Sequence, residues 1–316
     1  MRIFFGGLKV ICTLVVVLIS LNIVSPGQEF SVILLGTGAP EPVIERFGPS
    51  TLVNAGDQKL LFDSGRGATQ RLWQLGIQLP AISAVFLTHL HSDHIVGIPD
   101  LWLTSWLRGR RDAFKVWGPQ GTKEMMLHLE RAYAFDIHMR RDEDTRLPGS
   151  GVAVEAKDIG EGVVYEAGGV KVTALLVDHG DIKPAYGYRV DFGGRSVVVS
   201  GDTRYSENLV RHAKGTDVLV HEVIDAASFR ARMRNLTAEQ VASIVGHHTS
   251  AEDAGRVFAQ VKPKLAVYSH VIPWNTQDLL SLTRKTYSGP VEVGKDLMKI
   301  DIGEEVRVTP WQEKPR

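Results

Sequence analysis

A cluster of metal-binding side chains occupies the six residues His89-Leu90-His91-Ser92-Asp93-His94. Imidazole nitrogens and carboxylate oxygens at this density are typical of a metal site, and the alternative is a polar loop with solvated histidines. In an extended segment that enters a turn, His89 and His91 point the same way and can bind one metal ion. Asp93 and His94 follow on the turn, where they can face a second ion.

The segments around this cluster indicate which fold presents it. Residues 81–87 are apolar and β-prone after Pro80, so they predict a buried strand whose carboxyl end carries the cluster. Strands are predicted at residues 31–35, 59–62, 84–88, 170–177, 196–200, 218–221 and 265–269, and helices at residues 68–75, 99–107, 122–133, 238–245 and 251–261. Two mixed halves with helices outside predict an α/β fold, a four-layer αββα sandwich.

Three further metal donors follow predicted strands in the same way. His179, Asp202 and His270 each come directly after an apolar, β-prone run. A single residue of this kind is more often a hydrogen-bonded capping residue, but the repeated placement favours a shared metal site. If the strand ends meet at one edge of the sandwich, these side chains join the cluster at residues 89–94.

The N-terminal segment differs from the rest of the chain. Arg2 and Lys9 precede an apolar run at residues 10–24, and Ser25-Pro26-Gly27 follows. This layout predicts a signal peptide over residues 1–27, or an uncleaved N-terminal membrane anchor, because the apolar run is short for a spanning helix. Residues 28–316 are expected to form one domain. The protein is therefore predicted to be exported, periplasmic or extracellular, and to touch a membrane only through residues 1–27.

Composition narrows the chemistry of the exported part. The single cysteine, Cys12, lies in the apolar run, so histidines and carboxylates are the only strong metal donors left. The 36 basic and 36 acidic residues of the whole chain balance, and without Arg2 and Lys9 the remainder is slightly acidic. A near-neutral protein has no global electrostatic attraction to nucleic acid.

The chain resembles the metallo-β-lactamase superfamily, in its ribonuclease Z and arylsulfatase-like branch. Besides the His-x-His-x-Asp-His motif at residues 89–94, the resemblance rests on Leu35-Gly36-Thr37-Gly38, Leu61-Phe62-Asp63-Ser64-Gly65, His179 with Gly187-Tyr188-Arg189, Ser200-Gly201-Asp202-Thr203-Arg204 and His270. It implies one zinc ion held by His89, His91 and His179, a second held by Asp93, His94 and His270, and a bridging ligand in Asp202.

The implied centre contains two Zn²⁺ ions, although Mn²⁺ or Fe suits the same nitrogen and oxygen donors. Two such ions lower the pKa of a shared water, which supplies hydroxide for hydrolysis near neutral pH. Asp93 is expected to accept a proton from that water while it remains a ligand. Asp63 is expected to orient the metal-binding loop without binding metal.

A glutamate and a histidine outside the metal-binding motifs indicate the ribonuclease Z branch more specifically. His221-Glu222 and His248-Thr249-Ser250 resemble the ribonuclease Z segments in which a glutamate orients a histidine. The resemblance implies that Glu222 orients His248, and that His248 donates a proton or hydrogen bond to the departing oxygen. The alternative is a His–Glu pair with a structural role. His247 is expected to point elsewhere, as a solvated neighbour.

Two departures argue against a tRNA substrate. Ribonuclease Z enzymes carry a Pro-x-Lys-x-Arg segment, and here Ile44 replaces the lysine in Pro42-Val43-Ile44-Glu45-Arg46. They also carry a long basic arm after the Gly-Tyr-Arg segment, whereas only residues 190–199 separate Arg189 from Ser200. Nucleic acid is therefore not expected as a partner. A small-molecule ester is expected, and a homodimer is left open.

The sequence thus predicts an exported dinuclear-zinc hydrolase that cleaves a small phospho- or sulfo-ester, like a phosphodiesterase or arylsulfatase. Three alternatives stay open: a ribonuclease Z-type 3′ RNA endonuclease, a lactonase or β-lactamase-like hydrolase, and a non-catalytic, metal-stabilised binding protein.

Several residues are candidates for contact with the substrate. Trp102 and Trp106 share a helical face and are expected in the core, or else as an aromatic wall beside the metals, with Trp274 on the opposite rim. The candidates for holding an anionic group are Arg46, Arg204 and Lys183. The basic clusters Arg108-Arg110-Arg111 and Arg230-Arg232-Arg234 are expected to be solvated faces.

Overall fold

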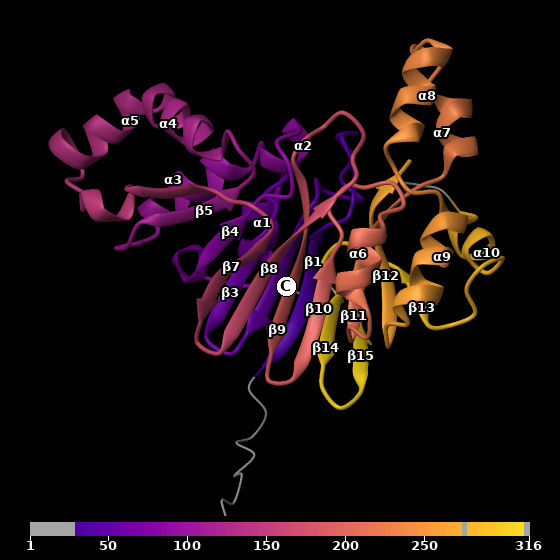
Figure 1. Ribbon diagram of the computed structural model, residues 1–316. Helices are drawn as coiled ribbons and strands as arrows, with labels where there is room; N and C mark the ends of the chain where they lie inside the picture. Colours follow the sequence, from indigo (N-terminus) through magenta and orange to yellow (C-terminus); the bar gives the residue numbers. More distant parts are fainter. Residues whose placement is uncertain (1–28, 274–276, 313–316) are drawn as a thin grey trace, which may run out of the picture.

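Two β-sheets packed face to face, with helices on both outer faces, form the body of the protein (Figure 1). The computed structural model describes residues 29–273 and 277–312. The predicted signal peptide, residues 1–27, and Trp274 lie outside these ranges. Within them, no helix has the length and apolar character needed to cross a membrane.

The first sheet has eight strands in the order β15-β14-β1-β2-β3-β4-β5-β6. They are β1 (Phe30–Gly36), β2 (Ser50–Ala55), β3 (Gln58–Phe62), β4 (Ala84–Phe86), β5 (Phe114–Gly118), β6 (Val154–Asp158), β14 (Lys299–Ile302) and β15 (Val306–Thr309). The strands from β3 to β6 run parallel, so their carboxyl ends meet at one edge of the sheet.

The second sheet has seven strands in the order β13-β12-β11-β10-β9-β8-β7. They are β7 (Gly162–Ala167), β8 (Val170–Val177), β9 (Ala185–Phe192), β10 (Arg195–Val199), β11 (Val218–Ile224), β12 (Leu265–Ile272) and β13 (Val291–Val293). The strands from β10 to β13 run parallel, which gathers a second set of carboxyl ends opposite the first.

The helices divide between the two outer faces. The first sheet is covered by α1 (Ala68–Gln74), α3 (Ile98–Leu107), α4 (Thr122–Ala132) and α5 (Ala134–His138), and the second by α6 (Glu207–Ala213), α9 (Ala251–Val261) and α10 (Leu279–Thr283). The short α2 (Ser92–Ile95) and the pair α7 (Ala226–Arg232) and α8 (Ala238–Gly246) lie beyond the strand ends (Figure 1). Shorter turns are η1 (Leu79–Ala81), η2 (Met139–Glu143) and η3 (Gly149–Gly151).

Alternating side chains sort the core into layers. In β1, Val32 and Leu34 face the second sheet, while Ile33 and Leu35 face the helices. Successive side chains of a strand point to opposite faces, so residues 32–35, which are buried on both faces of the sheet, are all apolar and join two cores. The predicted four-layer αββα sandwich is confirmed.

Trp102 and Trp106 lie in the core and not beside the metal-binding residues. Both side chains are fully buried between α3 and the first sheet. Their indole N–H groups donate to the carbonyl oxygens of Val152 and Pro148, each at 2.9 Å. The aromatic-wall alternative is therefore wrong for these two residues, and packing in the core is the correct interpretation.

Replacing Trp106 with alanine should lower the free energy of unfolding by about 3–5 kcal/mol, because a large buried ring leaves a cavity. Urea denaturation measures this loss. Trp73→Ala is the matched control, since the Trp73 side chain is 54% exposed. Equal losses in the two variants would contradict the core assignment.

Candidate metal centre

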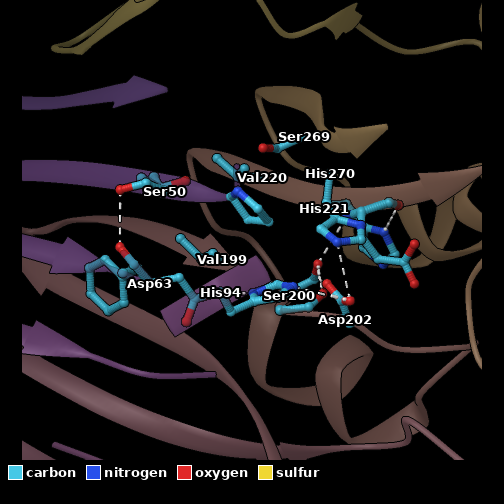
Figure 2. Close-up of a pocket in the computed structure, with 15 residues that line it drawn as sticks. Ser50, Asp63, His94, Val199, Ser200, Asp202, Val220, His221, Ser269 and His270 are labelled. Atoms are coloured by element: carbon cyan, nitrogen blue, oxygen red, sulfur yellow. Dashed lines mark hydrogen bonds and ion pairs between the residues drawn. The ribbon is translucent and has the colours of Figure 1, made fainter. Parts of the chain in front are cut away.

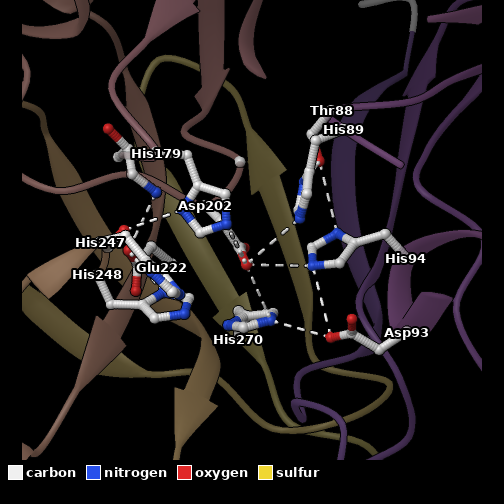
Figure 3. Close-up of polar contacts among 12 residues, drawn as sticks. Thr88, His89, Asp93, His94, His179, Asp202, Glu222, His247, His248 and His270 are labelled. Atoms are coloured by element: carbon white, nitrogen blue, oxygen red, sulfur yellow. Dashed lines mark hydrogen bonds and ion pairs between the residues drawn. The ribbon is translucent and has the colours of Figure 1, made fainter. Parts of the chain in front are cut away.

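The metal-binding candidates come from loops and strand ends at one edge of the sandwich. His89 and His91 follow β4, and Asp93 and His94 lie in α2. The remaining three come from the second sheet: His179 after β8, Asp202 after β10 and His270 near the end of β12. The structure thus brings all seven predicted ligands together, as Figure 3 shows for six of them.

His270 reaches the site through an irregularity in its strand. It lies inside β12 and not in a loop after it, and its φ of 45° is in the left-handed region. The pairing of β11 with β12 shifts here, because Tyr268 pairs with His221 and Val271 already pairs with Val223. Such a bulge re-aims one side chain at the cost of local strain, so the position of His270 is a built feature of the site.

The candidate ligands form two groups that share Asp202. The ligand atoms of His89, His91, His179 and Asp202 lie within 4.8 Å of one another, and so do those of Asp93, His94 and His270. Asp202 Oδ2 lies 3.3 Å from Nε2 of both His94 and His270. It also lies 3.8 Å from His89 Nε2 and 3.9 Å from His179 Nε2. This carboxylate therefore stands between the two groups (Figure 3).

The donor atoms fit a divalent metal ion. Among the described residues, Nε2 of His89 and of His179 and Oδ1 of Asp202 are buried without a hydrogen-bond partner. Burying unpaired polar atoms is costly, and a bound cation removes that cost. Burial, opposed in part by the Asp202 carboxylate, lowers the pKa of His179 to about 4, which keeps its ring neutral for binding metal.

Hydrogen bonds behind the ligands fix their orientation. Asp63 Oδ2 lies 2.7 Å from His94 Nδ1, and Asp63 also accepts from the backbone N–H and hydroxyl of Thr88 at 2.8 and 2.9 Å. The backbone oxygen of His247 lies 2.9 Å from His179 Nδ1. Both contacts leave Nε2 to face the metal position, because partners of this kind set the histidine tautomer. Asp63 thus lies where an orienting residue was predicted.

The Asp63→Asn variant is expected to bind metal about 10–100-fold more weakly, as is typical when a carboxylate behind a histidine ligand is lost. Competition with a chromophoric chelator measures this affinity. Asp57→Asn, in the exposed turn between β2 and β3, is the matched control. If Asp63→Asn retains wild-type metal affinity, Asp63 does not orient His94.

Glu222 and His248 form a buried pair next to the ligands. His248 Nδ1 lies 3.2 Å from Glu222 Oε1, which also accepts from the backbone N–H groups of Thr203 and Thr249 at 3.1 and 3.0 Å. Burial works to lower the pKa of His248, but the adjacent Glu222 carboxylate outweighs it and raises the pKa above its usual value. The His248 ring also stacks on His270 with centroids 5.6 Å apart. This geometry suits a proton donor beside the metal position.

His247 does not point away from the site, contrary to the expectation from the sequence. Its ring makes an edge contact with His179, with centroids 4.8 Å apart, and it lines the cavity over the ligands. Burial and the nearby His248 lower the pKa of His247 to about 4. The loop from α8 to α9 lies against the site here, because the backbone oxygen of His247 is hydrogen-bonded to His179.

A cavity of about 450 Å³ opens in front of the ligands. One side carries polar groups of His91, Asp93, Asp202, His247, His248 and His270. The other side is mostly apolar and consists of Pro40, Glu41, Phe229, Met233, Leu236, Ile244 and Ile272. The apolar wall comes mainly from α7 and α8, and sequence reasoning missed it.

The proposed anion-holding residues lie elsewhere. Arg46 donates to the hydroxyl of Thr37 and to the carbonyl oxygen of Gly294, and Arg204 pairs with Asp178 at 2.9 Å. Neither arginine nor Lys183 is among the described residues that line the cavity.

A second, smaller cavity of about 30 Å³ borders Asp202, His94 and His270 (Figure 2). Ser50, Ser200, His221 and Ser269 line it together with Asp202. Its size and the polar groups among its lining residues suit one or two water molecules.

Comparisons with known proteins identify the family. Residues 53–271 match the family described as Beta-lactamase superfamily domain. Ribonuclease Z of Mycolicibacterium gilvum (strain PYR-GCK) is 34% identical over 281 residues, which cover 86% of this chain and 96% of that protein. Ribonuclease Z of Mycobacterium avium (strain 104) is 33% identical over 280 residues, which cover 86% of this chain and 98% of that protein.

Solved structures share the fold. The metallo-beta-lactamase fold protein YhfI from Bacillus subtilis superposes with a TM-score of 0.67 at 19% identity, covering 86% of this chain and 99% of that one. Human tRNase Z, short form, superposes with a TM-score of 0.65 at 20% identity, with the same coverage.

The chain therefore belongs to the beta-lactamase superfamily and has the metallo-β-lactamase fold. It is a metal-dependent hydrolase that acts on ester bonds. Within the superfamily, it belongs with the homologues named Ribonuclease Z.

These relatives overturn two predictions. The prediction that the substrate is a small phospho- or sulfo-ester is wrong. The prediction that nucleic acid is not a partner is also wrong. The long arm is absent, since only Gly193-Gly194 joins β9 to β10. However, the match covers 96% of the M. gilvum protein, so that relative has little room for a long arm either. The near-zero net charge was a poor guide, because an average over the chain does not describe how charged residues are distributed on the surface.

Proposed function

We propose that this protein is a ribonuclease Z-type endonuclease, which uses two zinc ions to cleave a phosphodiester bond in the 3′ part of an RNA. The observation that carries this proposal is the match over nearly the full length of proteins named Ribonuclease Z. The buried Glu222–His248 pair beside the ligand cluster supports it, because a ribose oxygen is a poor leaving group that needs a proton.

Two ion sites would share Asp202, which stands between His89 and His179 on one side and His94 and His270 on the other. When bound, the metal ions supply an activated water and stabilise negative charge on the phosphoryl oxygens. Zinc suits these nitrogen and oxygen donors, and Mn²⁺ or Fe is the alternative.

Two side chains of the protein would accept and donate the protons of the reaction. Asp93 Oδ2 lies 3.3 Å from His270 Nε2 at the cavity floor, where its carboxylate can accept a proton from the attacking water. His248 lines the same cavity, and the Glu222 carboxylate outweighs burial and raises its pKa, which favours the protonated ring. It would donate that proton to the departing oxygen, so one group accepts a proton and the other supplies one.

A 5′-labelled tRNA precursor with a 3′ extension tests the proposal. The zinc-loaded protein should make one internal cut and release the extension as a single fragment. Removing the metal with EDTA should abolish cleavage, and adding zinc back should restore it. Stepwise release of single nucleotides, or no cleavage by protein that holds two metal ions, would overturn the proposal.

We also propose that residues 1–27 direct export, on the basis of their signal-peptide layout. Cell fractionation with an antibody against residues 28–316 tests this. The prediction is that the protein is found outside the cytoplasm, and an exclusively cytoplasmic protein would contradict it.

A further inference from the structure

We infer that the α7–α8 pair, residues 226–246, is an RNA-binding element that holds one nucleobase beside the metal centre and contacts the neighbouring phosphates. This inference rests on the proposed ribonuclease function and identifies the surface that positions the RNA. Both helices project beyond the strand ends on the side of β11 and β12 (Figure 1).

An apolar recess on this pair faces the metal ligands. Phe229 and Met233 come from α7 and the turn after it, Leu236 from the connection, and Ile244 from α8. They line the 450 Å³ cavity that also contains His91, Asp93 and His248. Cavities of roughly 300–1,000 Å³ hold groups the size of a nucleotide. Proteins bind unstacked RNA bases against apolar and aromatic side chains of this kind, so a base next to the cleaved phosphate fits here.

Glu41 supplies a polar contact within the same cavity. One of its carboxylate oxygens is buried and lacks a hydrogen-bond partner among the described residues. An unsatisfied buried acceptor is costly, and a donor on the ligand would remove the cost. Adenine, cytosine and guanine carry amino groups and uracil carries none, so the recess should favour an amino-bearing base.

Arginines lie on the same helix pair as the recess. Residues 226–246 contain Arg230, Arg232 and Arg234 against one acidic residue, Glu239. All three arginines are exposed, and their side chains form no ion pair with the residues described. The other basic cluster differs, because Arg110 is buried and donates to the carbonyl oxygen of Ile82 at 2.8 Å. Unpaired exposed arginines next to a base recess suit the phosphates that flank a bound base.

The phosphate contacts are tested by replacing all three arginines, Arg230→Ala, Arg232→Ala and Arg234→Ala, in the zinc-loaded protein. KM for the tRNA precursor should rise about tenfold, and the slope of log KM against log salt should fall by about 2, as expected for three phosphate contacts on a single strand. The matched control replaces three exposed arginines, Arg131 of α4 and Arg108 and Arg111 between α3 and β5, and should leave both quantities unchanged. Figure 1 shows α3 and α4 on the opposite side of the molecule from α7 and α8.

The base contact is tested with precursors that carry an abasic nucleotide on either side of the cleaved bond. With one of the two abasic precursors, kcat/KM of the wild-type protein should be about tenfold lower than with the intact precursor, as expected for the loss of one stacked base. The double variant Leu236→Ala/Ile244→Ala should lose much less kcat/KM than the wild type when the base is removed.

The Glu41 contact is tested by the base at the same position of the precursor. Glu41→Gln should weaken the preference for cytosine over uracil there. Hydrolysis of bis(p-nitrophenyl) phosphate normalises each preparation for active centres.

An unchanged salt slope in the arginine variant, or equal abasic penalties in the wild type and the double variant, would overturn the inference while RNA cleavage itself persists. Cleavage of the aryl diester without any cleavage of RNA would instead contradict the proposed function, and the inference with it.

Discussion

The Asp202→Asn variant is expected to lose about 10³-fold or more in kcat/KM for RNA. Metal ions contribute several kcal/mol to stabilising charge in the transition state, and each 1.36 kcal/mol corresponds to tenfold in rate. Asp202 Oδ2 is within 3.9 Å of Nε2 of four histidines, so the substitution removes the one negative charge that both groups share. Bound metal, measured by mass spectrometry, should fall from two ions per chain to one or fewer.

Asp301→Asn is the matched control for this experiment. Asp301 is a half-exposed carboxylate that pairs with Lys299 on β14, away from the ligands. It should keep full activity and full metal content. An Asp202→Asn protein that hydrolyses RNA at the wild-type rate would contradict the shared-ligand arrangement.

The His248→Ala variant should lose about 10²–10⁴-fold in kcat for RNA, the usual contribution of a general acid. A ribose oxygen needs a proton as it leaves, whereas p-nitrophenolate leaves without one. The loss for bis(p-nitrophenyl) phosphate should therefore be less than about tenfold. Equal losses on both substrates would mean that His248 has a structural role and is not a proton donor.

The pH profile gives a second readout of the same pair. Because the Glu222 carboxylate outweighs burial and raises the pKa of His248, the ring keeps its proton to a higher pH than an ordinary histidine, and activity should fall as pH rises through that pKa. In Glu222→Gln the pKa of His248 drops, so this alkaline limb should move to lower pH. A limb that does not move would show that another group controls it.

The candidate ligands could be predicted because their positions depend on short, local patterns. A buried strand is recognisable from its apolar run, and a donor just past that run lies at the sheet edge, as His179 and Asp202 do. The bulge that aims His270 has no such pattern, because it depends on how β12 pairs with β11.

Other features depend on packing over long distances and were missed. Strand β2 was not predicted, since the polar Ser50 and Asn54 interrupt its apolar pattern. Their side chains are nevertheless buried, because Ser50 donates to the Asp63 carbonyl oxygen and Asn54 to the Ser31 hydroxyl. Such pairings join residues that are far apart in the chain.

Helix α7 was also missed, although its start carries a local signal. The Asp225 side chain accepts from the backbone N–H groups of Ala227 and Ser228, as a typical N-cap does. The apolar wall of the cavity depends on α7 packing near Ile272 at the end of β12. No local pattern indicates that contact, so the apolar wall of the cavity could not be predicted from the sequence.

The most direct test of the central claim compares two substrates on the zinc-loaded wild-type protein, a tRNA precursor with a 3′ extension and bis(p-nitrophenyl) phosphate. A ribonuclease uses contacts remote from the reacting phosphate to lower its barrier, so kcat/KM should be on the order of 10³-fold higher for the RNA. A higher kcat/KM for the aryl diester, or no RNA cleavage at all, would contradict the assignment as an RNA endonuclease.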